Sequence, residues 1–387
     1  MYNVLTLNKI SPCGLNEMPK EYFNIYENGS MSDPSGILVR SSQIDNLNKN
    51  LLAIARAGAG VNNIPVNDCT QKGIVVFNTP GANANAVKEL VIASLILSSR
   101  KITSGITWVN SLRWEANLED AVEKNKDSFS GPEIMGKTLG VIGLGAIGGL
   151  VANGCQNLGM NVIGYDPHIS VGAAWSLSSK VEKAEAEDAL YTKCDYISVH
   201  IPFSLETRHR FSYDFFKKCK KGVRILNFSR GGLFDNTALL KAIEEGIVAC
   251  YVTDFPQKEL MGNPNIITIP HLGASTPESE DSCSTMASIQ LRNYLLYGNI
   301  KNSVNFPECQ IPYTGKHRLC IINKNEVNVI GKVTAILAKN GININEMINR
   351  SRGDVAYTII DVDESEKAIP VDEIFAINEI MRGRLIQ

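Results

Sequence analysis

Gly143-Leu144-Gly145-Ala146-Ile147-Gly148 joins the apolar run Thr138–Ile142 to the helix-like segment Ala146–Asn157. In a G-x-G-x-x-G turn the first glycine permits a tight turn, the second lets the backbone approach a pyrophosphate, and the third lets helix and strand pack closely. The unpaired N–H groups at the start of the helix favour an anion there. Such a motif alone often marks only a turn, but its place between a strand and a helix favours dinucleotide binding by Gly143, Gly145, Ala146, Ile147 and Gly148.

Asp166 ends the next apolar run, Asn161–Tyr165, and follows Gly148 by 18 residues. A carboxylate at this spacing accepts hydrogen bonds from the adenosine ribose hydroxyls and repels a 2′-phosphate. No arginine adjoins Asp166, since Pro167 and His168 follow it. We therefore expect NAD rather than NADP as the cofactor. The alternative interpretation of Asp166 is a solvated turn residue before a proline.

The composition is that of an ordinary soluble globular protein, with 387 residues, 44% hydrophobic residues, 20% charged residues and a formal charge of −2. The length suits two or three domains, and the absence of a basic excess argues against nucleic-acid and membrane partners. Nine scattered cysteines without a C-x-x-C pair predict free thiols and no metal site. The N-terminus alternates like a strand and lacks the pattern of a signal peptide, so we expect a cytoplasmic protein.

Strand-like runs alternate with helical segments over most of the chain, which is typical of parallel sheets covered by helices. Before residue 100 the strand candidates are Val4–Leu7, Ile37–Val39, Leu52–Ala55 and Val75–Phe77. The Ala- and Leu-rich segment Ala86–Ser99 then predicts a buried helix that connects two domains. From residue 137 on, six more candidates indicate a doubly wound dinucleotide-binding fold. They are Thr138–Ile142, Asn161–Tyr165, Tyr196–His200, Val223–Phe228, Ile247–Thr253 and Ile266–Ile269.

A long helix over Ser279–Tyr297 and an irregular, proline-containing linker lead to a third unit. Its predicted elements alternate as β-α-β-β-α-β, the pattern of a ferredoxin-like fold. They are Arg318–Ile322, the helix Val329–Lys339, Ile342–Ile348, Val355–Val362, the helix Asp372–Ile380 and Arg384–Ile386. A module of this size suits regulation or association better than chemistry.

Arg230 and His271 each lie just past a strand candidate, at the edge where open α/β sheets bind ligands. A guanidinium there can bind a carboxylate and polarise the oxygen at C2 of a 2-hydroxy acid, and a histidine can take the hydroxyl proton as hydride leaves. Glu259 would orient that imidazole and stabilise its charged form, with a solvated surface acid as the alternative. Asp254, at a strand end, would face the nicotinamide. His200 also ends a strand and is the competing base.

These motifs, together with Arg56-Ala57-Gly58-Ala59-Gly60-Val61, resemble those of the D-isomer-specific 2-hydroxyacid dehydrogenase family over nearly the whole chain. The resemblance implies an NAD-dependent dehydrogenase. It implies a catalytic set and two cofactor ligands, namely Arg230, Glu259 and His271 for catalysis and Asp166 and Asp254 for NAD.

The resemblance also implies a discontinuous architecture. A Rossmann-type NAD-binding domain (99–274) would be inserted in a flavodoxin-like substrate domain (1–98 and 275–300), followed by a linker (301–316) and a third domain (317–387). Two departures from the family pattern stand out. The family commonly has Asp-Val-Phe before the catalytic acid, whereas here Asp254 leads into Phe255-Pro256. Asn62 replaces an aspartate that many members carry, which we expect to alter a structural contact rather than catalysis.

The first domain must select the substrate, because the chemistry above is common to all 2-hydroxy acids. Arg40-Ser41-Ser42 and Arg56 follow strand candidates, and Asn83 lies in a loop before the connector helix. A phosphate with nearly two charges needs such cations, and the resemblance favours the same residues, Arg40, Ser41, Arg56 and Asn83. Ordinary surface arginines are the alternative.

We therefore expect oxidation of 3-phospho-D-glycerate to 3-phosphohydroxypyruvate, the first step of phosphorylated serine synthesis. Two alternatives stay open at this point. One is a dehydrogenase for another small D-2-hydroxy acid such as glycerate, and the other is a regulator that binds NAD without catalysis.

The third unit is similar to an ACT domain, a small-molecule sensor, and this resemblance implies L-serine as an effector bound by Asn323, Asn325 and Asn343. Where the family has Pro-Gly in the first loop, this chain has Val327-Asn328, and asparagine tolerates a left-handed backbone better than most residues. A module that serves only association is the alternative. We expect a homodimer or homotetramer, for which Ala86–Ser99 and the third unit offer symmetric surfaces.

Overall fold

The computed structural model describes residues 1–27, 31–315, 317–363 and 368–387. It divides into two compact units, the terminal unit Met1–Asn83 with Pro277–Gln387 and the central unit Ala84–Thr276. The boundary lies earlier than the predicted one at residue 98. Helix α3 (Ala84–Ser99) belongs to the central unit, because its buried side chains, such as Val91, lie in the core of that unit.

A five-stranded parallel sheet forms the N-terminal part of the terminal unit, in the flavodoxin-like order β2-β1-β3-β4-β5. Helix α11 (Pro277–Tyr297) packs on one face through residues such as Leu291, and α2 (Val66–Gln71) packs on the other through Cys69. The sequence patterns do not predict β2, an edge strand in which only Phe23 is buried. The remaining bounds are β1 (Tyr2–Leu7), α1 (Pro12–Leu15), β2 (Phe23–Glu27), β3 (Gly36–Val39), β4 (Ala53–Arg56) and β5 (Val75–Phe77).

The central unit contains a seven-stranded parallel sheet in the order β12-β11-β10-β9-β6-β7-β8. The order reverses at β6, as the doubly wound dinucleotide fold requires, so the predicted architecture is confirmed. The strands are β6 (Thr138–Ile142), β7 (Asn161–Tyr165), β8 (Glu182–Lys183), β9 (Tyr196–Val199), β10 (Val223–Asn227), β11 (Val248–Thr253) and β12 (Ile266–Thr268).

Helices cover both faces of this sheet. Helices α3 and α6 share one hydrophobic core with the sheet, and α8, α9 and α10 share the other. Both faces of the central strands are therefore buried, which explains their nearly continuous apolar sequences. The helices are α6 (Ala146–Asn157), α7 (Val171–Ser176), α8 (Glu187–Tyr191), α9 (Tyr213–Lys218) and α10 (Asn236–Glu244), with a short 3-10 turn η2 (Lys258–Leu260) after β11.

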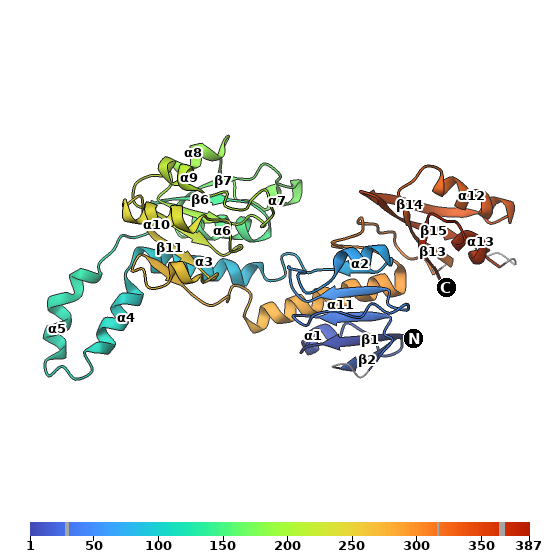
Figure 1. Ribbon diagram of the computed structural model, residues 1–387, viewed down its shortest axis with the longest axis horizontal. Coiled ribbons are helices and arrows are strands. Elements are labelled where there is room, and N and C mark those ends of the chain that lie inside the picture. Colours follow the sequence, from blue (N-terminus) through green and yellow to red (C-terminus); the bar gives the residue numbers. More distant parts are fainter. Residues whose placement is uncertain (28–30, 316, 364–367) are drawn as a thin grey trace. The chain divides into compact units, whose positions relative to one another are not determined.

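A helical arm, α4 (Ile102–Ser111) and α5 (Leu118–Asn125) with the 3-10 turn η1 (Lys126–Phe129), projects from the rest of the central unit (Figure 1). The sequence patterns do not predict it. Neither helix has a buried residue, and Trp114 at the tip is 86% exposed. Within the described ranges no single helix is both long and apolar enough to span a membrane. Helices α3 and α4 reach that length and composition only together, across a bend of 66°.

The C-terminal module (317–387) has the predicted β-α-β-β-α-β order and a four-stranded antiparallel sheet, β14-β15-β13-β16. Asn328 takes the left-handed conformation at the start of α12, with φ 66°. The predicted helix Asp372–Ile380 is wrong in its second half, because Ile380 already pairs with Asn323 in the sheet. The bounds are β13 (His317–Lys324), α12 (Val329–Lys339), β14 (Ile344–Arg352), β15 (Val355–Val362), α13 (Val371–Phe375) and β16 (Ile380–Ile386).

The module is packed on the N-terminal part of the terminal unit rather than tethered loosely to it. One face of its sheet, including Ile322 and Tyr357, shares a hydrophobic core with α11. Arg384 donates to the carbonyls of Tyr294 (2.7 Å) and Leu295 (3.2 Å) near the C-terminus of that helix. A cation at this end of a helix also interacts favourably with the helix dipole.

Candidate functional site

The central sheet places the predicted chemical residues along one edge. All its strands run in the same direction, so the residues that follow them meet at the carboxyl edge. The glycine turn follows β6, Asp166 follows β7 and His200 follows β9, while Arg230, Asp254 and His271 follow β10, β11 and β12. The residues expected to bind the cofactor phosphates and ribose therefore lie toward one side of this edge, and the residues expected to handle the substrate lie toward the other.

The glycine turn has the geometry that its sequence predicts. Gly143 has φ +89°, and a Cβ there would come within 2.5 Å of the His200 carbonyl oxygen. A Cβ on Gly148 would clash with the carbonyl oxygen of Gly143, whereas a Cβ on Gly145 would meet nothing within 4 Å. Gly145 is the N-cap of α6 and offers no side chain to its first N–H groups. The turn therefore leaves an open, uncapped helix start that fits a pyrophosphate.

Alanine substitutions should show which glycines of this turn and helix have no room for a side chain. Gly148→Ala should destabilise the central unit by about 1–3 kcal/mol, because the new methyl group overpacks the turn. It should also weaken NAD binding by more than about tenfold. Gly149→Ala is a matched control on the same helix, since its Cβ would meet only ordinary contacts of 3.7 Å or longer. Thermal unfolding and NAD titration measure both effects, and equal behaviour of the two variants would contradict the close-packing argument.

Asp166 holds the end of β7 against the glycine turn. Its Oδ2 accepts from the backbone N–H of Leu144 (2.9 Å) and its Oδ1 from that of His168 (2.9 Å). Each carboxylate oxygen has a further lone pair, so ribose hydroxyls can still donate to it. The contact of Asp166 with the adenosine ribose stays a prediction.

His200 lies behind the glycine turn and is not suited to be the base. Its Nε2 is 2.8 Å from the Ser198 hydroxyl, and its buried Nδ1 has no hydrogen-bond partner among the described residues. Burial lowers the pKa of His200 to about 4. An imidazole with that pKa is a poor proton acceptor near neutral pH.

Arg230 lies in a loop that Asn227 shapes at the end of β10. The Asn227 side chain donates to the Arg230 carbonyl (3.0 Å) and accepts from the Ser229 N–H (3.2 Å). The guanidinium is exposed and donates only to the carbonyl of Ser229 (2.7 Å) among the described residues. Most of its N–H groups are therefore available to a carboxylate ligand.

Asp254 connects the end of β11 to the loop that carries His271. Its side chain is buried, and Oδ2 accepts from the Gly273 N–H (3.1 Å). Burial raises the pKa of Asp254, and the nearby charges of His271 and Arg230 oppose that rise. Its Oδ1 is buried without a hydrogen-bond partner in the described part of the chain. A carboxamide N–H₂ would satisfy this acceptor, so the edge fits a nicotinamide.

His271 is exposed after β12, and its ring packs against that of Phe255 with centroids 4.7 Å apart. Glu259, in η2, is also exposed. The described residues include no hydrogen bond or ion pair between Glu259 and His271, so the structure does not bring this predicted pair together. The charges of Asp254 and His271 do interact.

The predicted substrate residues of the terminal unit follow β3 and are held by polar side chains that the sequence patterns do not reveal. Arg40 forms an ion pair with Glu280 at 2.6 Å. Asn8 accepts from the backbone N–H groups of Ser41 (2.9 Å) and Ser42 (2.8 Å). The loop after β3 is therefore fixed through its backbone by Asn8.

Asn63 links this loop to Arg56 at the end of β4. It accepts from Arg56 Nε (3.0 Å) and donates to the carbonyl of Ser42 (2.7 Å). Asn83, the last residue of the first segment of the terminal unit, is half-buried. Arg56 is therefore oriented by an asparagine that has no recognisable sequence motif.

The three asparagines predicted to bind an effector do not gather in one copy of the module. Asn323 and Asn325 lie at or after the C-terminal end of β13, whereas Asn343 precedes β14 at the opposite end of the sheet. Seven residue steps along β13 separate these ends, which is about 23 Å.

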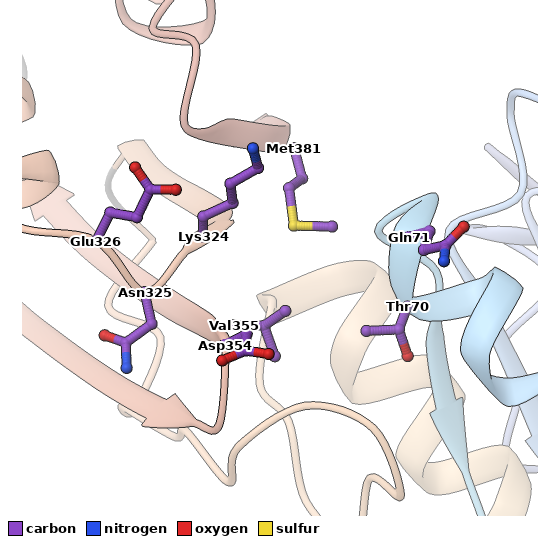
Figure 2. Close-up of a pocket in the computed structure, with 8 residues that line it drawn as sticks. All are labelled: Thr70, Gln71, Lys324, Asn325, Glu326, Asp354, Val355 and Met381. Atoms are coloured by element: carbon purple, nitrogen blue, oxygen red, sulfur yellow. The ribbon is translucent and has the colours of Figure 1, made fainter.

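Asn325 lies instead at a pocket of about 370 Å³, with the module on one side and α2 on the other (Figure 2). The other lining residues are Thr70, Gln71, Lys324, Glu326, Asp354, Val355 and Met381.

The chain has many relatives among characterised proteins. Residues 92–273 match the NAD-binding domain of the D-isomer specific 2-hydroxyacid dehydrogenases. The D-3-phosphoglycerate dehydrogenase of Pongo abelii is 34% identical over 322 residues, covering 78% of this chain and 58% of that protein. That of Archaeoglobus fulgidus is 37% identical over 269 residues, covering 68% of this chain and 49% of that protein. The matched part thus spans about half the length of these relatives.

A solved structure agrees with these sequence matches. The NAD⁺-bound 3-phosphoglycerate dehydrogenase of Entamoeba histolytica superimposes with a TM-score of 0.61 at 25% identity, covering 79% of this chain and 98% of that one. Its cofactor supports NAD as the dinucleotide for which the glycine turn, Asp166 and Asp254 are suited. Residues 92–273 therefore belong to the NAD-binding domain family of the D-isomer specific 2-hydroxyacid dehydrogenases, and the chain is a homologue of the D-3-phosphoglycerate dehydrogenases.

Proposed function

We propose that the chain catalyses the NAD-dependent oxidation of 3-phospho-D-glycerate at C2, giving 3-phosphohydroxypyruvate. The observation that carries this proposal is the alignment of Arg230, Asp254 and His271 on the same sheet edge as the glycine turn. A protein that only senses NAD needs neither a base nor a carboxylate-binding cation there. The names of the relatives favour the phosphorylated substrate over other 2-hydroxy acids.

Each residue on this edge has a distinct part in the proposed reaction. NAD, when bound, supplies the hydride acceptor. His271 takes the proton of the C2 hydroxyl at its imidazole, while Arg230 binds the carboxylate and polarises the C2 oxygen. Asp254 holds the loop that carries His271 through the Gly273 N–H. Glu259 orients the imidazole when it turns toward His271, since catalytic hydrogen bonds often tighten only with substrate bound.

We assign the substrate phosphate to Arg40, Ser41, Arg56 and Asn83. A phosphate with nearly two charges forms strong charge-assisted hydrogen bonds with guanidinium groups. Arg40 is paired with the half-exposed Glu280, and such an exposed pair contributes about 0–1 kcal/mol. A doubly charged ligand can therefore displace Glu280 at little cost.

A product assay tests this proposal. We expect NADH to form from NAD⁺ and 3-phospho-D-glycerate when a coupled reaction removes the keto acid. D-Glycerate and D-lactate should react with kcat/KM lower by more than about tenfold, because they lack the phosphate. Equal or better rates with an unphosphorylated acid would favour the alternative dehydrogenase. No NADH with any 2-hydroxy acid, despite NAD binding, would favour the non-catalytic regulator.

We further propose that L-serine, the end product of the pathway this reaction would begin, acts through the C-terminal module. Because Asn325 and Asn343 lie at opposite ends of the sheet, such a site needs two modules side by side, one supplying each end. Repeating the product assay with L-serine tests this, with D-serine as the control. Equal rates with and without L-serine would leave association as the function of the module.

We also propose that the chain is a homodimer or homotetramer. The arm exposes several large apolar side chains, Ile106, Val109, Trp114 and Leu118, which a second copy could cover. Light scattering of the purified protein gives the number of copies, and a monomer at micromolar concentration would contradict this.

All nine cysteines are free thiols, which favours the reducing cytoplasm as the place of the reaction.

A further inference from the structure

The side chain of Phe255 packs against the ring of His271. The two ring centroids are 4.7 Å apart and the ring planes are tilted by 50°. Phe255 follows Asp254 directly at the end of β11 and is half-buried.

The backbone around Phe255 is fixed on several sides. Its N–H donates to the Thr253 hydroxyl (3.1 Å), and that hydroxyl donates to the carbonyl of Asn227 (2.9 Å). The preceding Asp254 is bound to the Gly273 N–H. The following Pro256 restricts residue 255 to extended conformations. The backbone that carries the phenyl ring is therefore held by the same strand ends that form the candidate site.

His271 itself has few other constraints. Its imidazole is exposed and makes no hydrogen bond among the described residues, and Glu259 does not contact it. The tilted contact with Phe255 restricts rotation of the imidazole ring. Pairs of aromatic rings in such tilted arrangements are favourable beyond the area they bury.

We infer that Phe255 is a positioning residue that holds the imidazole of His271 in the orientation needed for proton transfer. This inference rests on the proposed function, in which His271 is the base. An imidazole that is free to rotate spends part of its time facing away from the substrate hydroxyl, and misplacement of a catalytic group by about 1 Å is costly in rate. Phe255 replaces the acidic partner as the means of orientation in the structure described here.

Kinetics of Phe255 variants test the inference. Phe255→Leu keeps apolar volume but loses the ring, and we expect kcat to fall by about tenfold. The KM for NAD⁺ should stay within about twofold and thermal stability should change little, because the fixed backbone is retained. Phe255→Tyr keeps the ring and should restore kcat. Phe129→Leu, a matched change of a half-buried phenylalanine in the arm, should leave kcat unchanged.

An NMR measurement tests the contact between Phe255 and His271 independently of catalytic activity. The chain has five histidines, so the His271 ring protons can be assigned by comparison with a His271→Asn variant. The ring current of Phe255 should shift them in the native protein and in Phe255→Tyr, but not in Phe255→Leu. Unshifted protons in the native protein, or a normal kcat in Phe255→Leu, would overturn the inference. Full activity of His271→Asn would instead overturn the proposed base, whatever the ring-current result.

Discussion

Replacing His271 with alanine is expected to lower kcat with 3-phospho-D-glycerate by about 10²- to 10⁴-fold, the range that a general base contributes. The Kd for NAD⁺ should stay nearly constant, because His271 lies far from the turn expected to bind the pyrophosphate. The loop that carries His271 follows β12, four strand spacings from the glycine turn after β6, which is about 19 Å. Stopped-flow or steady-state NADH formation gives kcat, and fluorescence titration gives the Kd.

A variant of another histidine is the control that shows whether the loss of turnover is specific to His271. His209 is exposed in a loop and has φ 51°, a backbone conformation that asparagine also accepts. His209→Asn should therefore keep kcat within about twofold of the native value. If His271→Ala retained a tenth or more of native turnover, another group would have to take the proton. His200 would be a poor substitute, because burial lowers its pKa to about 4.

The parts of the fold that sequence predicts well are those whose pattern is enforced by burial. The β-strand Val355–Val362 and the helix Val329–Lys339 have the predicted bounds, because each carries an apolar face that packs in the module core. The glycine turn is equally predictable, since backbone geometry admits no side chain at Gly148. In these places local preference and tertiary packing favour the same structure.

Elements without a buried face give a weaker signal. Helices α4 and α5 bury no residue, so they lack the periodic spacing of apolar residues that predicts a core helix. The second half of the helix predicted to end at Ile380 is not helical, because pairing with β13 gives that residue a tertiary partner that outweighs helix propensity.

The candidate site likewise contains residues that the sequence patterns predict and residues that they do not. Arg230, Asp254 and His271 are predictable because each ends a strand at the ligand-binding edge. Asn8 and Asn63 are not, because they act through hydrogen bonds to backbone groups far away in sequence, and the bond from Arg56 to Asn63 belongs to no recognisable motif. The expected contact between Glu259 and His271 depends on loop conformation, which spacing in the sequence does not determine.

Loss of Asp361 is expected to be the most destabilising single change in the C-terminal module. Arg318 is fully buried, and Asp361 accepts from its Nε (2.6 Å) and Nη2 (2.7 Å). The other three N–H groups donate to the carbonyls of Tyr297 (2.8 Å), Ile311 (3.2 Å) and Pro312 (3.0 Å). All five donors of the guanidinium are therefore used, and the ion pair connects the module to the end of α11 and to the linker.

Asp361→Ala leaves a buried positive charge without its counter-ion, which should lower the free energy of unfolding by about 3–5 kcal/mol. Urea-induced unfolding followed by circular dichroism measures this. Glu373→Gln is the matched control, because it breaks an exposed pair with Lys339 and should cost less than about 1 kcal/mol. A double change to Arg318→Met with Asp361→Leu removes both charges but leaves three carbonyls without a donor. It should therefore recover part, and not all, of the lost stability. Full recovery would show that those carbonyls need no donor, and an unchanged Asp361→Ala variant would show that the ion pair does not stabilise the module.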